Sequence, residues 1–581
     1  MEVTEHTFTS WDATELFYRA WIPAEPTDRA LLLFHRGHEH SGRWQETVDI
    51  LNLPEVAIFA WDARGHGRSP GERGGTRNLS DVIKDVDAFV RHISARYRIP
   101  LPNMIVLAHS LAAVTVTAWV HDYGPPICAM ILATAAFRVK LYVPFAIRFL
   151  RLKQKVMGPG HVTSYVKARM LTHDRGQAAT YDADPLIFRQ IAINVLLDLQ
   201  DTANRLLADA GTIQTPTLML TAGSDWVVSL KAQRQFFERL SSPVKRFENF
   251  PDAYHALFHE ENRRQIIASV RDFVLERFAH KAPAPSSLNA DRVGHTREEY
   301  DRLRNGNGGG AKFAVARAGL KMAGHLSKGI GLGWRSGFDS GLSLDYVYEN
   351  RPRGATPVGR LIDQAYLNSI GWRGIRQRKT NLEKALKDVI RKLHEDGQPV
   401  RILDIAAGPG RYVLETLHAL SEIPASATLR DYKQENVDAA GALTQKLALD
   451  RVKVERGDAF DRASLATTEP RATIGIVSGL YELFPSNDVV LESLRGLADA
   501  IDRGGYLIYT NQPWHPQVEF IARVLRNREG KPWVMRRRTT AEMDELVASV
   551  GFKKVEMEVD QWGMFTVAIA LRGGCGHPER R

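Results

Sequence analysis

The stretch "NMIVLAHSLAAVTVTAWVH", residues 103–121, places a serine between two segments of different character. A short apolar run, residues 104–108, precedes Ser110, and residues 111–121 are compatible with a helix. Two interpretations of Ser110 are open at this point. It is either a serine buried in the core or a nucleophile held on a sharp turn between a strand and a helix.

The same alternation of strand and helix runs through the N-terminal part of the chain. The apolar runs "RALLLFHRG" and "EVAIFAWDARGHG" end in glycine-containing turns, and "SDVIKDVDAFVRHISARY" has helical spacing. This rhythm predicts an α/β fold with a mostly parallel sheet covered by helices. Residues 137–205 interrupt the rhythm with mixed apolar and basic segments, which indicates an insertion that caps the sheet.

Two polar residues farther along the chain favour the nucleophile interpretation of Ser110. A nucleophilic serine needs a histidine to take its proton and an acid to orient that histidine. Asp225 in "TAGSDWVV" follows one expected strand, and His255 in "FPDAYHALFHE" follows the next. Because the carboxyl ends of parallel strands meet at one edge of a sheet, we expect all three side chains to gather there.

Two glycine-rich loops connect this part of the chain to a known family. Residues 35–44 read "HRGHEHSGRW" and residues 62–69 read "DARGHGRS". With these loops, residues 14–275 resemble the α/β-hydrolase fold, specifically the monoacylglycerol lipase and lysophospholipase group. The resemblance implies a serine ester hydrolase that acts on a lipid-like acyl ester, with the backbone N–H groups of Gly37 and Leu111 as its oxyanion hole.

The chain departs from the pattern of that family at four positions. Alanine replaces both glycines of the G-x-S-x-G turn, at Ala108 and Ala112, and the oxyanion loop carries Arg36 and His38 in place of glycines. Added bulk and charge beside an oxyanion hole would alter substrate choice or lower activity. The alternative is therefore a hydrolase-fold domain that binds or acts as a scaffold without turnover.

A second series of strands and helices begins at "VRILDIAAGPGRYVLETL", residues 400–417. Its glycines do not form the three-glycine dinucleotide pattern, which disfavours a dehydrogenase. Small residues let a backbone approach an amino-acid and ribose moiety, and an acid at the strand end can meet a positive amino group. Acids after the next two strands would then meet the ribose hydroxyls and the adenine amine. The expected binding residues are Asp404, Ala406, Gly408, Gly410, Asp431, Asp458 and Ala459.

With this motif series, residues 400–572 resemble a class I S-adenosylmethionine-dependent methyltransferase with a Rossmann-like fold. The resemblance implies S-adenosyl-L-methionine as the cofactor. Tyr481, Glu482 and His515 are candidates for holding or deprotonating the methyl acceptor, and residues 511–514, "NQPW", are interpreted as a turn. Transfer of a methyl group depends mostly on alignment, so a dedicated base is not required.

The chain as a whole resembles bacterial fusions of these two domains. The expected division is residues 1–280 for the hydrolase domain with its cap at about 137–205, 281–310 for a linker rich in Pro, Ser, Gly and charge, 311–399 for a helical N-terminal extension of the methyltransferase, and 400–581 for the methyltransferase domain. Residues 312–335 carry basic and apolar residues without an acid. They form either an interfacial amphipathic helix or a helix packed on the methyltransferase. Aromatic residues of the segment that follows, Tyr346, Tyr348, Tyr366 and Trp372, are candidates for lining a pocket.

Composition limits the remaining function classes. The 581 residues carry a net charge of +10 and two cysteines, Cys128 and Cys575, which give no disulfide framework and no zinc-ligand spacing. We find no signal peptide and no apolar stretch long enough to span a bilayer, so we expect a cytoplasmic enzyme that contacts the anionic inner membrane face through basic segments. We expect no metal and, without an aromatic–basic binding module, no nucleic-acid partner. The prediction is a bifunctional enzyme whose two halves act on one lipid or lipid-derived metabolite.

Overall fold

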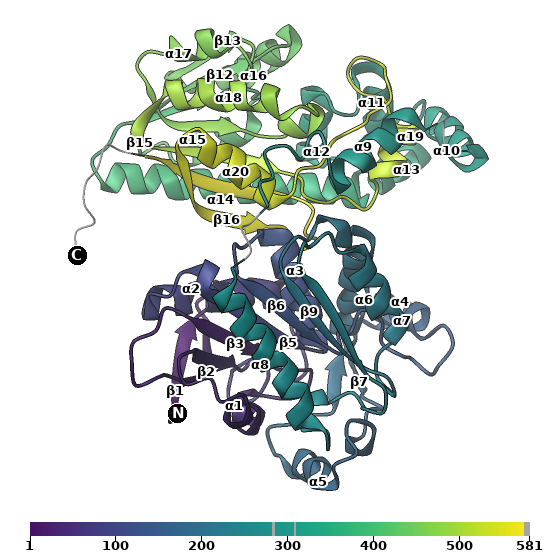
Figure 1. Ribbon diagram of the computed structural model, residues 1–581. Coiled ribbons are helices and arrows are strands. Elements are labelled where there is room, and N and C mark those ends of the chain that lie inside the picture. Colours follow the sequence, from purple (N-terminus) through teal and green to yellow (C-terminus); the bar gives the residue numbers. More distant parts are fainter. Residues whose placement is uncertain (282–284, 307–309, 574–581) are drawn as a thin grey trace. The chain divides into compact units, whose positions relative to one another are not determined.

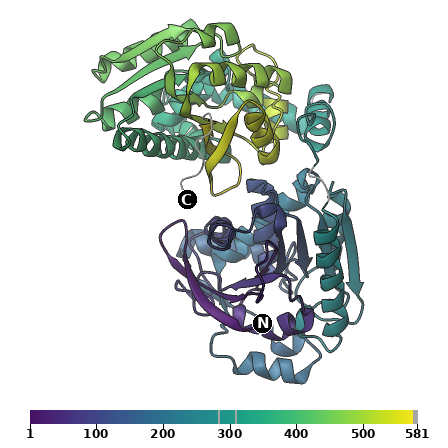
Figure 2. The same ribbon diagram turned by 60° about the vertical axis from the view of Figure 1, so that its left-hand side comes forward.

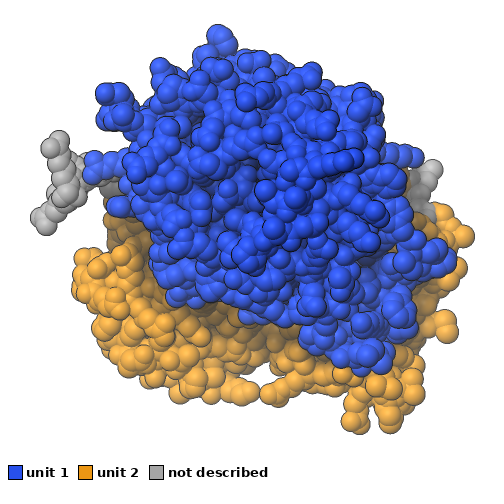
Figure 3. Space-filling view, turned by 90° about the horizontal axis from the view of Figure 1, so that it is seen from below, with its two compact units in different colours: residues 1–285 blue, residues 286–581 orange. Residues whose placement is uncertain are grey.

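The computed structural model of the chain describes residues 1–281, 285–306 and 310–573. Two compact units divide the chain, Met1–Pro285 and Ser286–Arg581, and Figure 3 colours them separately. Cys128 is half-buried in the first unit, whereas Cys575 lies outside the described residues. None of the helices in the described ranges is long and apolar enough to cross a bilayer.

Unit 1 is built on an eight-stranded sheet in the order β1-β2-β4-β3-β5-β6-β9-β10 (Figure 1). Its strands are β1 Val3–Thr9, β2 Glu15–Trp21, β3 Ala30–Phe34, β4 Ala57–Trp61, β5 Met104–His109, β6 Ala129–Ala133, β9 Thr217–Ala222 and β10 Lys245–Phe250. β4, β3, β5, β6, β9 and β10 pair in parallel, and β1 and β2 add an antiparallel edge. The α/β class predicted for this half is therefore confirmed.

Helices cover both faces of this sheet, as Figures 1 and 2 show. They are α1 Gln45–Leu51, α2 Leu79–Tyr97, α3 Leu111–Tyr123, α7 Leu230–Arg239 and α8 Arg263–Ala279. β3 and β6 are apolar along their whole length, and β5 is apolar up to His109, because these strands are buried on both sides. α1 and α8 pack on the face of Leu31 and Leu33, whereas the Phe89 ring of α2 stacks 5.9 Å from Trp61 on the other face.

The segment between β6 and β9 forms the cap of unit 1. It contains α4 Ala146–Met157, α5 Arg175–Ala183, α6 Ile193–Asp209 and a small hairpin, β7 His161–Thr163 with β8 Gln190–Ala192. Only Leu150 of α4 is buried, and it packs on Ile193 and Leu197 of α6. The outer helix of the cap, α4, is therefore held by one buried residue, and most of its other side chains are exposed.

Unit 2 is built on a seven-stranded sheet in the order β13-β12-β11-β14-β15-β17-β16 (Figure 1). Its strands are β11 Val400–Asp404, β12 Ala425–Asp431, β13 Val452–Arg456, β14 Ala472–Val477, β15 Ile501–Asn511, β16 Phe552–Val559 and β17 Thr566–Arg572. The helices of this sheet are α15 Arg411–Ala419, α16 Gln434–Lys446, α17 Arg462–Ala466, α18 Asn487–Ala500, α19 Val518–Val524 and α20 Thr540–Ser549. β17 runs antiparallel to β15, so the sheet is the doubly wound type predicted, with an antiparallel terminal pair.

Six helices precede this sheet and belong to unit 2: α9 His295–Asn305, α10 Gly310–Ala323, α11 Lys328–Ser336, α12 Gly341–Glu349, α13 Pro357–Leu367 and α14 Ile370–Glu395. Residues 281–310, expected as a linker, thus include a folded helix. α9 buries Tyr300 and Leu303, and its C-terminal carbonyl of Leu303 accepts a hydrogen bond of 3.0 Å from Arg523 Nη1. Composition alone did not reveal the helix because its stabilising partner lies over two hundred residues away.

Candidate active sites

Ser110 stands on a strained turn between β5 and α3. Its φ is 58° and its ψ is −113°, a region that residues with a side chain rarely occupy. The Ser110 N–H donates to the Ala133 carbonyl at 2.9 Å, and the Ser110 carbonyl accepts from Ala136 at 3.1 Å. These bonds hold the strained turn in place. Ala108 and Ala112 are both buried, so methyl groups at the two glycine positions leave the turn intact.

The three residues predicted to form a catalytic group are within hydrogen-bonding distance in series. Ser110 Oγ lies 2.8 Å from His255 Nε2, and His255 Nδ1 lies 2.9 Å from Asp225 Oδ2. Asp225 Oδ1 accepts from the N–H groups of Val227 and Val228. Burial opposes the charged form of Asp225, but His255 and these two N–H groups outweigh it and lower the pKa of the carboxyl. An ionised Asp225 therefore orients His255 toward Ser110.

The loop of the predicted oxyanion hole is fixed by His35. His35 Nδ1 lies 2.8 Å from the Arg36 carbonyl, and Nε2 accepts from the Ala63 N–H at 3.0 Å. Burial, together with the nearby His66, lowers the pKa of His35 to about 4, so the ring is neutral and Nδ1 is the donor. Because C=O and N–H point in opposite directions in a trans peptide, this bond turns the Gly37 N–H away from His35. Gly37 adjoins Leu111, the first residue of α3, whose N–H has no partner within the helix.

The two departures in this loop bring no net charge to it. The Arg36 guanidinium is buried, pairs with Glu39 at 2.8 Å and lies 4.8 Å from the ring of Tyr181 on α5. Burial opposes ionisation of Glu39, but Arg36 and other cations outweigh it and hold its pKa below the usual range. Burial, with His66 and Arg36, lowers the pKa of His38 to about 3, so that ring is neutral. Arg36 thus ties the oxyanion loop to the cap.

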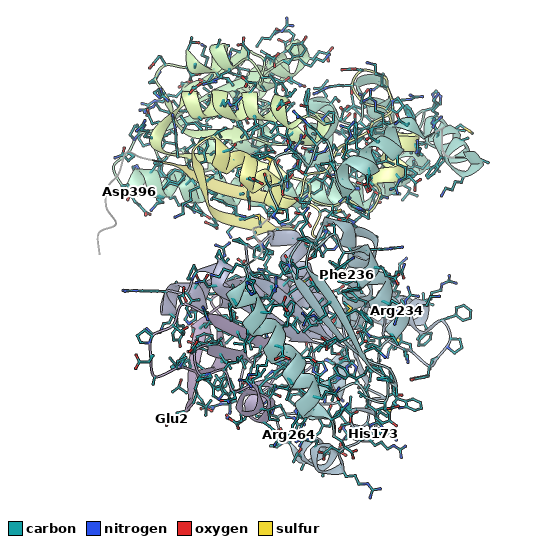
Figure 4. The ribbon with its side chains drawn as sticks, in the orientation of Figure 1. Glu2, His173, Arg234, Phe236, Arg264 and Asp396 are labelled. Atoms are coloured by element: carbon teal, nitrogen blue, oxygen red, sulfur yellow. The ribbon has the colours of Figure 1, made fainter. Side chains whose placement is uncertain are left out.

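The cap also supports the loop that carries His255. The Ala256 N–H donates to the Leu171 carbonyl at 2.8 Å. Glu260 accepts from the N–H groups of His173 and Tyr254, and the ring of His173, labelled in Figure 4, lies 3.7 Å from that of Tyr254. This part of the cap therefore helps to hold His255 in position, together with His109 and Thr134, which lie within hydrogen-bonding distance of its carbonyl.

The space at the predicted oxyanion hole is small. A cavity of about 40 Å³ is lined by Gly37, Leu111, Thr115 and, from the cap, Val195. This volume holds little more than a water or two. This cavity is too small for a long acyl chain, which would need a shift of the cap or another entry.

In unit 2, Asp404 ends β11 in a fully buried position. Its Oδ2 has no hydrogen-bond partner among the described residues, and its Oδ1 is 3.5 Å from the Ala406 N–H. Burial raises the pKa of Asp404 to about 7, and the nearby Tyr412 and the Ala406 N–H lower it only in part. A buried carboxyl with one unpaired oxygen is costly and is a signature of a binding site.

The glycine-containing turn after β11 is joined to the acid at the end of β12. Gly408 and Gly410 have φ values of 55° and 68°, and a Cβ on Gly410 would lie 2.5 Å from the Leu429 side chain. The Gly408 N–H donates to Asp431 Oδ2 at 2.9 Å, and Asp431 Oδ1 accepts from the Lys433 N–H. These contacts join the turn after β11 to the end of β12, and Gly341 of α12 lies close to Gly408.

The third predicted strand end adjoins the second. The Gly457 N–H donates to the Asp431 carbonyl at 3.0 Å, which sets the following Asp458 and Ala459 beside it. Asp458 is exposed, and its Oδ1 accepts from the Phe460 N–H at 3.0 Å; Ala459 is buried. All seven predicted residues therefore lie at the carboxyl ends of β11, β12 and β13. An orphaned acidic oxygen beside a glycine cradle fits S-adenosyl-L-methionine, which carries a cationic amino group.

Unit 2 also contains a cavity of about 450 Å³. Its lining shows which of the residues predicted to hold the methyl acceptor face a common space. Glu482, His515, Tyr366 and Trp372 line it, whereas the Tyr481 hydroxyl bonds to Ser493 instead. Tyr346 donates to Asp363 at 2.6 Å and is also turned elsewhere. Sequence reasoning did not identify three further lining residues, Arg378, Gly479 and Gln512. Gln512 sits in the stretch interpreted as a turn, and no local pattern marks Arg378 within α14.

Two family models match the chain, one described as "Serine aminopeptidase, S33" over residues 25–262 and one described as "Putative methyltransferase" over residues 270–572. The Escherichia coli (strain K12) protein YnbC is 47% identical over 577 aligned residues, with 98% of each chain covered. The monoacylglycerol lipase of Mycolicibacterium smegmatis is 25% identical over 274 residues, covering 47% of this chain and 97% of the lipase. The crystal structure of Paleococcus ferrophilus monoacylglycerol lipase covers 48% of this chain and 100% of its own, at 21% identity and a TM-score of 0.41. The predicted union of a hydrolase half with a methyltransferase half is confirmed.

The buried Asp404 makes the stability of unit 2 depend on pH. Its pKa is about 7 in the folded chain and near 3.8 when exposed, so folding favours the protonated form. The stability that unit 2 gains from protonated Asp404 is complete below pH 4 and is lost as the pH rises through 7. We expect Asp404→Asn to stabilise unit 2 by roughly 2–4 kcal/mol at pH 8 and to have little effect at pH 4. Urea unfolding followed by hydrogen exchange of β11 and β14 peptides measures this, with the exposed Asp450→Asn as control. Equal effects at both pH values would contradict the assignment.

Proposed function

The chain belongs to the family described as "Putative methyltransferase", with a serine-hydrolase-type domain ahead of it, and from this premise we propose that it is a bifunctional enzyme. The N-terminal half hydrolyses an acyl ester, and the C-terminal half transfers a methyl group from S-adenosyl-L-methionine. The hydrogen-bonded series of Ser110, His255 and Asp225 supports the first activity. The unpartnered carboxyl of Asp404 beside its glycine cradle supports the second.

In the hydrolase half, Ser110 Oγ attacks the ester carbonyl while His255 Nε2 accepts its proton. The N–H groups of Gly37 and Leu111 stabilise the negative oxygen that develops. His255 then gives the proton to the departing alcohol, and a water activated by the same nitrogen releases the acid. Asp225 stays ionised and holds His255 in the tautomer that this transfer needs.

The substrate of this half is a lipid-like ester that enters through the cap. Phe145, just before the outer helix α4, and Phe149 and Val156 within it are 74%, 66% and 73% exposed. Arg148 and Lys155 are exposed beside them. An apolar face with flanking cations suits the interface of an anionic bilayer. Contact with lipid would compensate the exposed apolar area of α4 and would favour the cap movement that the small cavity requires.

In the methyltransferase half, Asp404 would hold the donor's amino group and Asp431 its ribose hydroxyls. Asp458 and Ala459 would border the adenine. When bound, S-adenosyl-L-methionine supplies a methyl group activated by its positive sulfur. The chain's contribution is to orient the donor and to exclude water, because methyl transfer depends mainly on alignment.

Ser110→Ala should abolish labelling by a fluorophosphonate probe, because only an activated serine reacts with it. Asp225→Asn should retain the fold and label roughly 10⁴-fold more slowly, because His255 is left in the wrong tautomer. Ser269→Ala, on the outer part of α8, is the matched control and should label normally. Absence of labelling in the wild-type chain would instead favour the alternative, a hydrolase-fold domain that binds without turnover.

Binding of S-adenosylhomocysteine should tighten as pH rises through 7, because its amino group binds only the ionised form of Asp404. With a pKa of about 7 in the free protein, the dissociation constant should fall roughly fivefold to tenfold between pH 6 and pH 7.5. Isothermal titration calorimetry should also detect proton release. Asp404→Asn should bind weakly and without this dependence, whereas Asp450→Asn should match wild type. No heat from the wild-type chain would refute the donor site.

Vesicles of phosphatidylglycerol and phosphatidylcholine should bind the chain, and salt should weaken that binding. A Phe145→Ser and Phe149→Ser double variant should partition at least about tenfold less, because two exposed rings no longer enter the interface. Leu275→Ser removes an apolar side chain that is 43% exposed on α8 and serves as the control. If wild type and double variant sediment equally with the vesicles, α4 is not the contact.

A further inference from the structure

The 450 Å³ cavity of unit 2 has the size and walls of a small-molecule site. α10, α13, α14 and α19 contribute apolar side chains such as Leu320, Ile362, Trp372 and Phe520, and Trp533 lines the cavity from the loop after α19. None of the residues predicted to hold the methyl donor lines it. A ligand of this cavity would therefore be a molecule other than the methyl donor, and the greater part of it would be apolar.

The cavity has an inner end at the sheet and an outer end at the surface. Gly479 and Gln512 line it directly after β14 and β15, at the carboxyl edge where a doubly wound sheet places its ligands. Gly319 on α10 and Ala365 on α13 also line it, and both are exposed. A ligand can thus extend from the surface of the two helices to the edge at which the donor is proposed to bind.

Hydrogen-bond donors meet at the inner end. Arg378 and Gln512 are 2% and 3% exposed, and neither Arg378 Nε nor Gln512 Nε2 has a partner among the described residues. His515 Nδ1 accepts from the Gln517 N–H at 3.0 Å, which leaves the proton of the neutral ring on Nε2. Burial, with Arg537, lowers the pKa of His515 to about 3, so the ring stays neutral. Unpaired buried donors are costly, and a ligand oxygen would satisfy them.

Among the described residues, each candidate base that lines the cavity already has a partner. The lone pair of His515 Nδ1 is already occupied, and Glu482 Oε1 faces the Arg378 guanidinium at 3.4 Å. Asp339 accepts from the Arg528 N–H. A methyl acceptor at this place must therefore be nucleophilic without losing a proton, which a carboxylate is at neutral pH and an alcohol or an ammonium group is not.

We propose that this cavity binds a long-chain carboxylic acid, with its chain along the apolar walls and its carboxylate at Arg378, Gln512 and His515 as the methyl acceptor. The proposal rests on the proposed methyltransferase function of unit 2. A carboxylate oxygen forms a bond to the methyl carbon, and the carbon–sulfur bond of the donor breaks with its electron pair left on sulfur. The negative and positive charges cancel and no proton moves, so no base is needed. Such an acid is also what hydrolysis of an acyl ester in unit 1 would release.

Three probes of equal chain length test the proposal: dodecanoate, 1-dodecanol and dodecylamine, each below its micelle concentration. The full chain is used with Ser110→Ala, so that unit 1 cannot hydrolyse a methyl ester that unit 2 forms. Calorimetry should show one dodecanoate per chain bound at least about tenfold more tightly than the alcohol, and weaker binding still of the amine. With S-adenosyl-L-methionine present, methyl dodecanoate should accumulate.

Gly319→Leu locates the binding in unit 2. Gly319 lines the cavity and a Cβ built on it meets no atom within 4 Å, so a leucine fits at this mouth without disturbing α10. Dodecanoate binding should weaken at least about tenfold, since the chain and the leucine compete for one space. Gly441→Leu on α16 is the matched control, because its Cβ also meets nothing within 4 Å. Gln512→Leu should weaken dodecanoate while leaving the alcohol unchanged.

The outcomes separate this proposal from the donor site. Dodecanoate that binds Gly319→Leu as it binds the control, or a preference for the alcohol or the amine, would overturn the proposal. S-adenosylhomocysteine should bind Gly319→Leu and the control equally. If S-adenosylhomocysteine fails to bind at all, the methyltransferase function fails, while loss of dodecanoate binding in Gly319→Leu would still identify the cavity as an acid-binding site.

Discussion

Parallel strands bring their carboxyl ends to one edge of a sheet, and the groups proposed to react in this chain are organised by such edges. Ser110 follows β5, Asp225 follows β9 and His255 follows β10, so three segments distant in sequence meet above one sheet. In unit 2 the residues predicted to bind the methyl donor lie at or just after the carboxyl ends of β11, β12 and β13. The sheets thus determine where chemistry can occur, while the loops determine which chemistry it is.

The two buried carboxyls at these edges illustrate how loops make that difference. Asp225 receives two backbone N–H groups and His255, so it is ionised and acts as a fixed anchor. Asp404 is equally buried but keeps an oxygen without a partner, so its pKa rises to about 7. Both oxygens of Asp225 have hydrogen-bond partners within the chain, so this carboxyl serves to position His255. Asp404 has one oxygen without a partner, which a bound cation would satisfy, and this is the behaviour of a ligand-binding group.

Departures from a family pattern are compensated within the same unit. Arg36 brings a charge to the oxyanion loop, yet Glu39 neutralises it and Tyr181 of the cap covers it. Alanine replaces glycine on both sides of Ser110, yet the strained turn forms because methyl groups fit there. The three-dimensional arrangement, and not the motif spelling, therefore decides whether such a site has the geometry for catalysis.

The sequence by itself determined the two α/β halves and the order of their strands' polar ends, because apolar periodicity and turn residues are local properties. From that order it also predicted residues for both sites. It did not reveal α9 within the expected linker, since its anchor, Arg523, is remote in sequence. Nor did it single out Arg378 and Gln512, which become distinctive only through burial without partners. Only the tertiary structure decided that Glu482 and His515 face one apolar cavity while Tyr481 does not. Burial and the pairing of polar atoms depend on contacts between distant segments, which no single stretch of sequence records.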